Sequence, residues 1–123
     1  MMDASQKQCL DPTGPQARSM LIVEDDEWLM RRLAQAMEAR GFQVMIAGSV
    51  FEGLAQLQLN APKYAVVDLR FKDGCGLDVV EVLMQQRPDA RAIILTGYGN
   101  IATAVKAAKL GVVDFLTKTC GCG

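Results

Sequence analysis

Short apolar runs alternate with longer amphipathic segments along this chain, and this alternation restricts its possible folds more than any other feature. The apolar runs are SMLIV (19–23), FQVMIA (42–47), YAVVD (64–68), RAIILT (91–96) and VVDFLTK (112–118). Such continuously apolar runs are typical of strands in a parallel sheet that is covered on both faces. The alternation therefore predicts a single α/β domain with right-handed crossovers.

The segments between these runs have helical periodicity and helical end signals. The predicted helices span residues 27–40, 50 to about 60, 77–86 and 100–111. Gly41 is expected to stop the first helix, and Ser49 is expected to be the N-cap of the second. A glycine-rich loop, RFKDGCG (70–76), precedes the third helix. No internal repeat interrupts this order, so one domain is expected.

Composition excludes several classes of protein. The chain has 123 residues, half of them apolar and 22% charged, which is enough for one core. A net charge of −1 and the lack of a Lys/Arg block give no sign of nucleic-acid or membrane binding. Residues 1–18 are polar, with two prolines and no signal-peptide core, so we expect a disordered segment and a cytoplasmic protein. The cysteines, without any histidine, do not have zinc-site spacing.

Polar residues follow four of the predicted strands, at the edge where parallel sheets bind ligands. They are Glu24, Asp25 and Asp26 after the first strand, Asp68 after the third, Thr96 after the fourth and Lys118 after the fifth. Two carboxylates 4 Å apart repel by about 4 kcal/mol at an effective dielectric of 20, so gathered acids recruit a cation or a proton. A ligand set of oxygen atoms alone favours Mg²⁺. Asp26 taken alone is expected to be a helix N-cap.

These residues resemble the receiver domains of bacterial two-component response regulators. The resemblance covers residues 19–118, and it implies a flavodoxin-like (CheY-like), doubly wound, five-stranded parallel sheet of order 2-1-3-4-5. More narrowly, RGFQV, YAVVDLR, GLDVVE, RPDAR and LTGYGNIATAV are similar to the RegA/PrrA/ActR group of redox-responsive transcriptional regulators. The resemblance therefore implies a signalling module that is not an enzyme, beyond self-catalysed phosphotransfer and autodephosphorylation.

The resemblance also implies a role for each site residue. Asp68 would be the phosphoacceptor, taking a phosphoryl group from a sensor histidine kinase. The Mg²⁺ ligands would be Glu24, Asp25, Asp68 and the backbone carbonyl of Arg70, with Glu24 acting directly or through water. Lys118 would pair with a phosphoryl oxygen. Thr96 and Phe115 would be the switch residues.

The end of the chain departs from the family pattern. Thr119 follows Lys118, where the family has proline, and TCGCG (119–123) stands where a fifth helix and a DNA-binding domain are expected. We interpret 119–123 as a non-native tail, and a one-base insertion in the coding sequence is our hypothesis for its origin. A missing fifth helix predicts an uncovered sheet face and self-association, with Leu21, Val23, Val66 and Phe115 as candidates for exposure.

Three other functions fit parts of the sequence. An aspartyl-phosphate phosphatase would have a second Asp two residues after its nucleophile, whereas residue 70 is arginine. GYGNIA (97–102) fits a nucleotide-binding G-x-G-x-x-A turn, but a nucleotide-binding enzyme leaves the acid cluster unexplained. A receiver-like interaction or dimerisation module that no longer accepts phosphate stays open, because of Thr119 and the missing helix.

Overall fold

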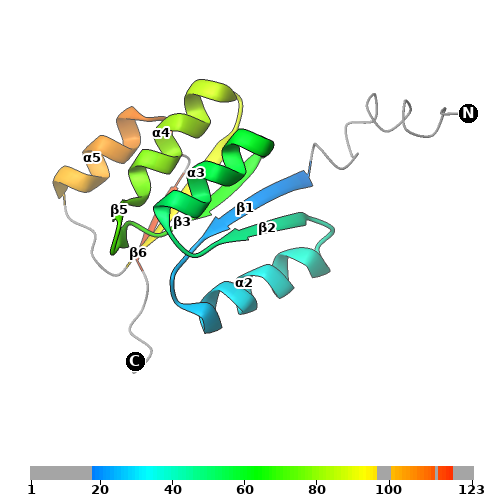
Figure 1. The fold of residues 1–123 in the computed structure, drawn as a ribbon. Coiled ribbons are helices and arrows are strands. Elements are labelled where there is room, and N and C mark those ends of the chain that lie inside the picture. The colour runs from blue at the N-terminus through cyan, green and yellow to red at the C-terminus, as the bar shows by residue number, and fades with distance from the viewer. Residues whose placement is uncertain (1–17, 97–100, 113, 118–123) are drawn as a thin grey trace, which may run out of the picture.

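The structure is a computed structural model that describes residues 18–96, 101–112 and 114–117 (Figure 1). Its five long strands are β1 (Ser19–Val23), β2 (Gln43–Ala47), β3 (Tyr64–Val67), β6 (Arg91–Thr96) and β7 (Asp114–Thr117). Its helices are α2 (Glu27–Ala39), α3 (Val50–Leu59), α4 (Gly76–Gln86) and α5 (Ile101–Lys109). The strands form one parallel sheet of order β2-β1-β3-β6-β7, so the predicted order is confirmed.

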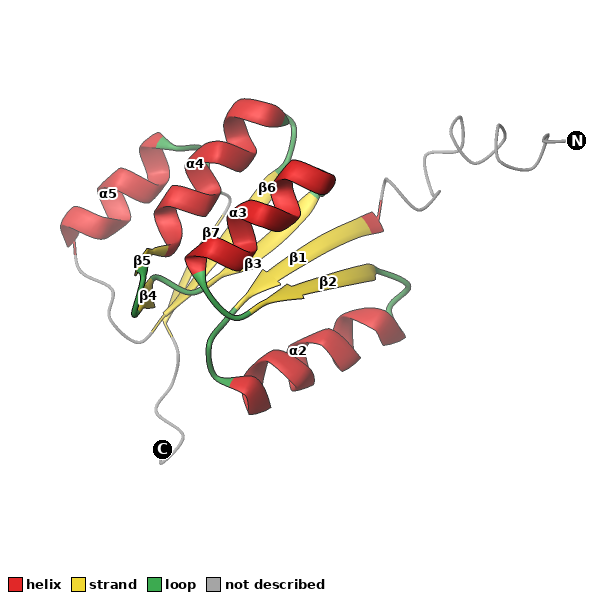
Figure 2. Cartoon of the chain, in the orientation of Figure 1, coloured by secondary structure: helices red, strands yellow, loops and turns green. Residues whose placement is uncertain are grey.

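Helices cover both faces of the sheet, but unequally. Helices α3, α4 and α5 lie on one side, and α2 lies on the other (Figures 1 and 2). The main core lies between the sheet and the three-helix side, where Val67, Val79, Leu83 and Ile94 are fully buried. This layered arrangement leaves the carboxyl ends of the strands accessible at one edge.

Strand β1 is buried on both faces, which corrects one expectation. Leu21 and Val23 belong to the main core, with 0% and 1% exposure, so the prediction that they are uncovered is wrong. Side chains alternate between the two faces of a strand. Met20 and Ile22 therefore point to the α2 side, where they are buried as well.

The α2 side of the sheet becomes more open toward β7. Helix α2 packs mainly over β1 and β2, and none of its side chains is fully buried. Val66 on β3 is half-buried, as are Ile93 and Leu95 on β6, and Leu116 on β7 is 45% exposed. The strand register puts these four residues on the face that carries Ile22. Figure 2 shows no second helix on this side among the described residues.

The predicted helix caps are confirmed. Asp26 accepts a hydrogen bond from the Leu29 backbone N–H at 3.1 Å, and Ser49 accepts one from the Glu52 N–H at 3.1 Å. Gly41 follows α2 with a φ of +92°, a left-handed conformation in which a side chain is strained.

The predicted loop 70–76 has additional structure. It forms an antiparallel hairpin of β4 (Arg70–Phe71) and β5 (Gly74–Cys75). The strands are only two residues long, which is too short to give a periodic pattern.

The predicted terminal segments lie mostly outside the described residues. This applies to residues 1–17, to the tail 119–123 and to the position of a fifth helix. Arg18, the last residue of the expected disordered segment, donates to the Arg40 carbonyl at 3.1 Å and lies over the Phe42 ring. In the described part of the chain, no helix has both the length and the apolar character required to cross a bilayer.

Candidate functional site

The carboxyl ends of the neighbouring strands β1 and β3 bring three acids together. Val23 pairs with Val67 in the parallel register, and the Asp68 N–H donates to the Val23 carbonyl at 2.9 Å. One carboxylate oxygen from each of Glu24, Asp25 and Asp68 lies within 4.8 Å of the others. The sheet therefore gathers the three side chains that the sequence predicts as metal ligands.

Backbone amides orient the two buried acids. Glu24 is 2% exposed and Asp68 is 7% exposed, whereas Asp25 is exposed. The Asp26 N–H donates to Glu24 Oε2 at 3.0 Å, and the Leu69 N–H donates to Asp68 Oδ1 at 2.7 Å. A buried carboxylate is costly unless it is hydrogen-bonded, so these amides stabilise the charged side chains.

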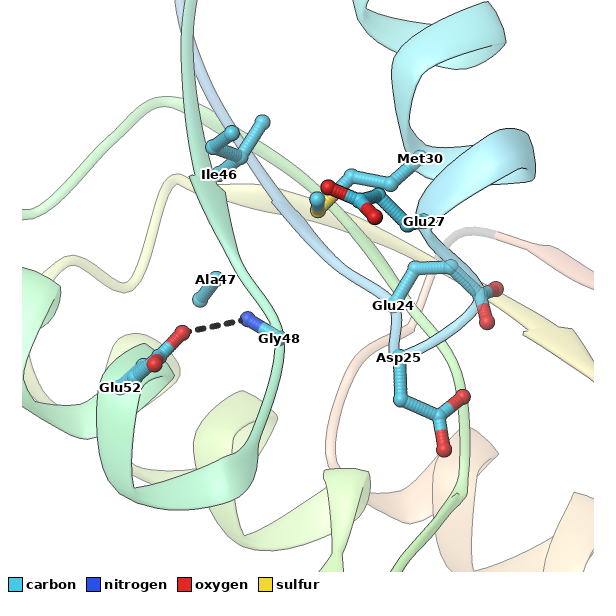
Figure 3. A pocket seen from close by; sticks show the side chains of 8 residues that line it. All are labelled: Glu24, Asp25, Glu27, Met30, Ile46, Ala47, Gly48 and Glu52. Atoms are coloured by element: carbon cyan, nitrogen blue, oxygen red, sulfur yellow. Dashed lines mark hydrogen bonds between the residues drawn. The ribbon is translucent and has the colours of Figure 1, made fainter.

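A cavity of about 300 Å³ opens beside Glu24 and Asp25 (Figure 3). Its other lining residues are Glu27, Met30, Ile46, Ala47, Gly48 and Glu52. Two of these acids already have partners, because Glu52 accepts from the Gly48 N–H at 2.7 Å and Glu27 pairs with Arg31 at 3.0 Å. The acids whose carboxylate oxygens lie close enough to share an ion are Glu24, Asp25 and Asp68.

The donor set fits Mg²⁺. Three carboxylates offer hard oxygen ligands, and the site is open to solvent on the side of the exposed Asp25. The close approach of three like charges is unfavourable without a cation, and Mg²⁺ keeps several water molecules, so a partly open site suits it.

The hairpin that follows Asp68 is fixed at both of its ends. At its base, the Gly76 N–H donates to the Leu69 carbonyl at 2.8 Å. At its tip, Asp73 accepts from the backbone N–H groups of Val50 and Phe51, the first residues of α3. These hydrogen bonds, the one from Phe51 above all, hold the pKa of Asp73 below its ordinary value of 3.8. Sequence reasoning did not identify Asp73, although Asp-Gly is a hairpin turn signal.

The remaining predicted site residues are only partly described. Thr96 ends β6, where its backbone pairs with Thr117, and Phe115 lies in β7 opposite Ile94. The side chains of Thr96 and Phe115 and the whole of Lys118 lie outside the described residues, as do residues 97–100 of the GYGNIA turn. Arg70 is the first residue of β4 and is exposed. The roles of these residues stay predictions.

A sheet of this order with acids at the ends of β1 and β3 is the arrangement expected for a receiver domain, and comparison with known families gives the same result. Residues 20–122 match the response regulator receiver domain model. The chain belongs to this family.

Two regulators illustrate the similarity within the family. The chain is 59% identical over 108 residues to the acid tolerance regulatory protein ActR of Rhizobium meliloti, covering 88% of this chain and 55% of that protein. It is 60% identical over 101 residues to the photosynthetic apparatus regulatory protein RegA of Cereibacter sphaeroides, covering 82% of this chain and 55% of RegA. The chain thus spans about half the length of these relatives. The similarity that the sequence indicated to the RegA/PrrA/ActR group is confirmed.

Solved structures have the same fold. A CheY-like receiver domain protein from Methanospirillum hungatei has a TM-score of 0.79 and 28% identity, covering 84% of this chain and 82% of that one. A response regulator from Burkholderia pseudomallei has a TM-score of 0.77 and 35% identity, covering 84% of this chain and 61% of that one. The second structure contains a phosphorylated aspartic acid and a calcium ion.

Proposed function

We propose that this chain accepts a phosphoryl group on Asp68 from a phosphohistidine of a sensor histidine kinase, with Mg²⁺ as cofactor. The observation that carries the proposal is the convergence of Glu24, Asp25 and Asp68 at the ends of adjacent strands. The phosphorylated aspartic acid and calcium ion in the Burkholderia pseudomallei regulator support the same chemistry.

In the transfer, a carboxylate oxygen of Asp68 forms a bond to phosphorus as the bond from phosphorus to the kinase imidazole nitrogen breaks. The nitrogen keeps that electron pair, and the imidazole leaves neutral because its other ring nitrogen carries a proton. The Leu69 N–H holds Asp68 Oδ1 at 2.7 Å, which fixes the orientation of the nucleophile. Positioning and charge neutralisation carry such a transfer, so no general base is required.

Glu24, Asp25, Asp68 and the backbone carbonyl of Arg70 would hold the Mg²⁺. When bound, the ion offsets the repulsion between these carboxylates and the phosphoryl oxygens. The burial of Glu24 and its bond from the Asp26 N–H keep its carboxylate directed toward the cluster.

The response to phosphorylation would involve β6 and β7, the two strands farthest from β2 in the sheet. In this proposal Lys118 pairs with a phosphoryl oxygen, Thr96 hydrogen-bonds the phosphoryl group, and Phe115 turns inward as the loop before α5 moves. This two-state movement would carry the signal. The backbone positions of Thr96 and Phe115 on the neighbouring strands β6 and β7 are compatible with this coupling.

In the parent family, the output of the switch would be transcription control. The similarity to ActR and RegA, both named as regulatory proteins, supports this part of the proposal. The chain matches about half the length of each, so the proposal for this chain itself is limited to the receiver step.

Self-association through the open part of the sheet is a further element of the proposal, with a second copy of this chain as the partner. The half-exposed apolar row on β3, β6 and β7 is the surface that this partner would cover. A second copy presents the same row, so a two-fold dimer would bury both.

The test of phosphoacceptor function is labelling by acetyl phosphate with Mg²⁺, read by intact mass and by hydroxylamine sensitivity of the adduct. We expect the mass gain of one phosphoryl group. A folded chain that stays unlabelled by acetyl phosphate and by phosphorylated histidine kinases would instead be a receiver-like interaction module.

A further inference from the structure

Asp73 joins two parts of the chain that are remote in sequence. Its Oδ1 accepts from the Val50 N–H at 3.1 Å, and its Oδ2 accepts from the Phe51 N–H at 2.9 Å. Helix α3 already has an N-cap in Ser49, which accepts from the Glu52 N–H. Asp73 therefore satisfies two further amides at the start of the helix, and both of its oxygens are used.

This connection holds the hairpin at its tip. The strand pairs Arg70–Cys75 and Phe71–Gly74 close the hairpin, and Gly74 packs against Val50, whose Cγ2 lies 3.6 Å from the Cβ position at residue 74. The base is held separately by the Gly76 bond to the Leu69 carbonyl. Arg70 lies between these two attachments, so both determine where its backbone carbonyl points.

The attachment lies beside the acid cluster. A cavity of about 430 Å³ opens beside the contact between the hairpin and the start of α3, and its lining residues are Asp25, Gly48, Ser49, Phe71, Lys72 and Asp73. Asp25 is one of the three clustered acids, so this cavity borders the metal site. A shift of the hairpin away from α3 would widen this cavity and move Arg70 relative to Asp25.

We propose that Asp73 is a positioning residue for the Mg²⁺ site, because it clamps the hairpin to α3 and thereby holds the Arg70 carbonyl in place for the ion. The inference rests on the Mg²⁺ site of the proposed function. A neutral carbonyl attracts the ion less than a carboxylate does. Its contribution to Mg²⁺ affinity is therefore greatest when the backbone already holds it in the ligand position before the ion binds.

The experiment is a titration of the full chain with MgCl₂, followed by the fluorescence of Trp28, which is 66% exposed and lies three residues after Asp25. Asp73→Ala should raise the Kd for Mg²⁺ about tenfold, the lower end of the effect seen when an outer partner of a metal ligand is removed. Asp73→Asn should have a smaller effect, since its amide oxygen can still accept one of the two hydrogen bonds.

Asp89→Ala is the matched control. Like Asp73, Asp89 is an exposed carboxylate with a lowered pKa, and it accepts a hydrogen bond from Lys63 Nζ at 2.9 Å. Lys63 precedes β3 and Asp89 precedes β6, so this pair lies at the edge of the sheet opposite the acid cluster. Urea unfolding of both variants shows how much stability each loses. The control should lose stability and keep the wild-type Kd for Mg²⁺.

A loss of stability in Asp73→Ala with an unchanged Kd would show that Asp73 only caps α3, and it would overturn the inference. If Asp73→Ala does not fold, the same criterion applies to Asp73→Asn, whose Kd must exceed that of the wild type. A wild-type chain that gives no Mg²⁺ response, by fluorescence or by calorimetry, would instead contradict the proposed function.

Discussion

Gly76 packs against the backbone carbonyl of Asp68 so closely that no side chain fits between them. A Cβ at residue 76 would overlap the Asp68 carbonyl oxygen and lie 2.7 Å from Val67 Cγ1. The first residue of α4 therefore determines the backbone position at the end of β3, where the proposed phosphoacceptor lies.

Replacing this glycine should displace Asp68. We expect Gly76→Ala to lose at least about 1–3 kcal/mol of unfolding free energy, the usual cost of forcing extra atoms into a packed site. Gly48→Ala is the control, because a Cβ there meets only Glu52 Oε1 at 3.5 Å, an ordinary contact. Urea denaturation measures both, and equal midpoints for the two variants would contradict the assigned packing.

Asp68 should be the only residue that takes up phosphate. Asp68→Asn replaces the nucleophilic carboxylate with an amide, so it should gain no mass with acetyl phosphate and bind no beryllofluoride. Asp78→Asn, an exposed acid in the first turn of α4, should be labelled as the wild type is. Labelling of Asp68→Asn at the wild-type level would place the phosphoacceptor elsewhere.

Asp25 should control the fluorescence response to Mg²⁺. We expect Asp25→Asn to abolish the change in Trp28 emission, because it removes a charged ligand from a cluster of three. Asp26→Asn is a close control: Asp26 lies outside the cluster, and asparagine also serves as an N-cap for the Leu29 N–H. A normal titration of Asp25→Asn would mean that the metal binds at another place.

Stability should decline in acid through the carboxyl groups of Asp73 and Asp89. The hydrogen bond from Lys63 is the main cause that holds the pKa of Asp89 below its ordinary value of 3.8. A carboxyl with a depressed folded-state pKa stabilises the fold above its unfolded-state pKa, and this contribution is lost as the pH falls through the folded-state pKa. Urea midpoints measured from about pH 5 downward should therefore fall. The urea midpoint of Asp89→Asn should fall less steeply as the pH decreases. A pH dependence identical to that of the wild type would exclude this contribution of Asp89.

The open part of the sheet should mediate self-association. Leu116→Asp puts a charge into the apolar row on the α2 side, so sedimentation velocity at micromolar concentration should show a shift toward monomer. Leu59→Asp is the control, since Leu59 is 81% exposed on α3, which lies on the other side of the sheet. A wild-type chain that sediments as a monomer, without binding an apolar dye, would contradict the proposed dimer.

The sequence predicts the sheet and the acid cluster well for physical reasons. Continuous apolar runs and the caps Asp26 and Ser49 set the element boundaries, and parallel strands place residues that follow them at one edge. Nothing in a strand that is apolar on both faces specifies which residues meet which helix, so the expectation for Leu21 and Val23 was wrong. The contact of Asp73 with α3 joins distant segments, and no local pattern encodes it.

The strand order also affects how the acid site arises during folding. Glu24 and Asp68 meet only after β1 and β3 pair, and the whole α2–β2–α3 segment separates those strands in the chain. Such non-local pairing forms after a long loop has closed, so the unfolded chain does not hold these carboxylates together. A cation that binds these carboxylates therefore stabilises the native state relative to the unfolded chain, by an amount that grows with the cation concentration.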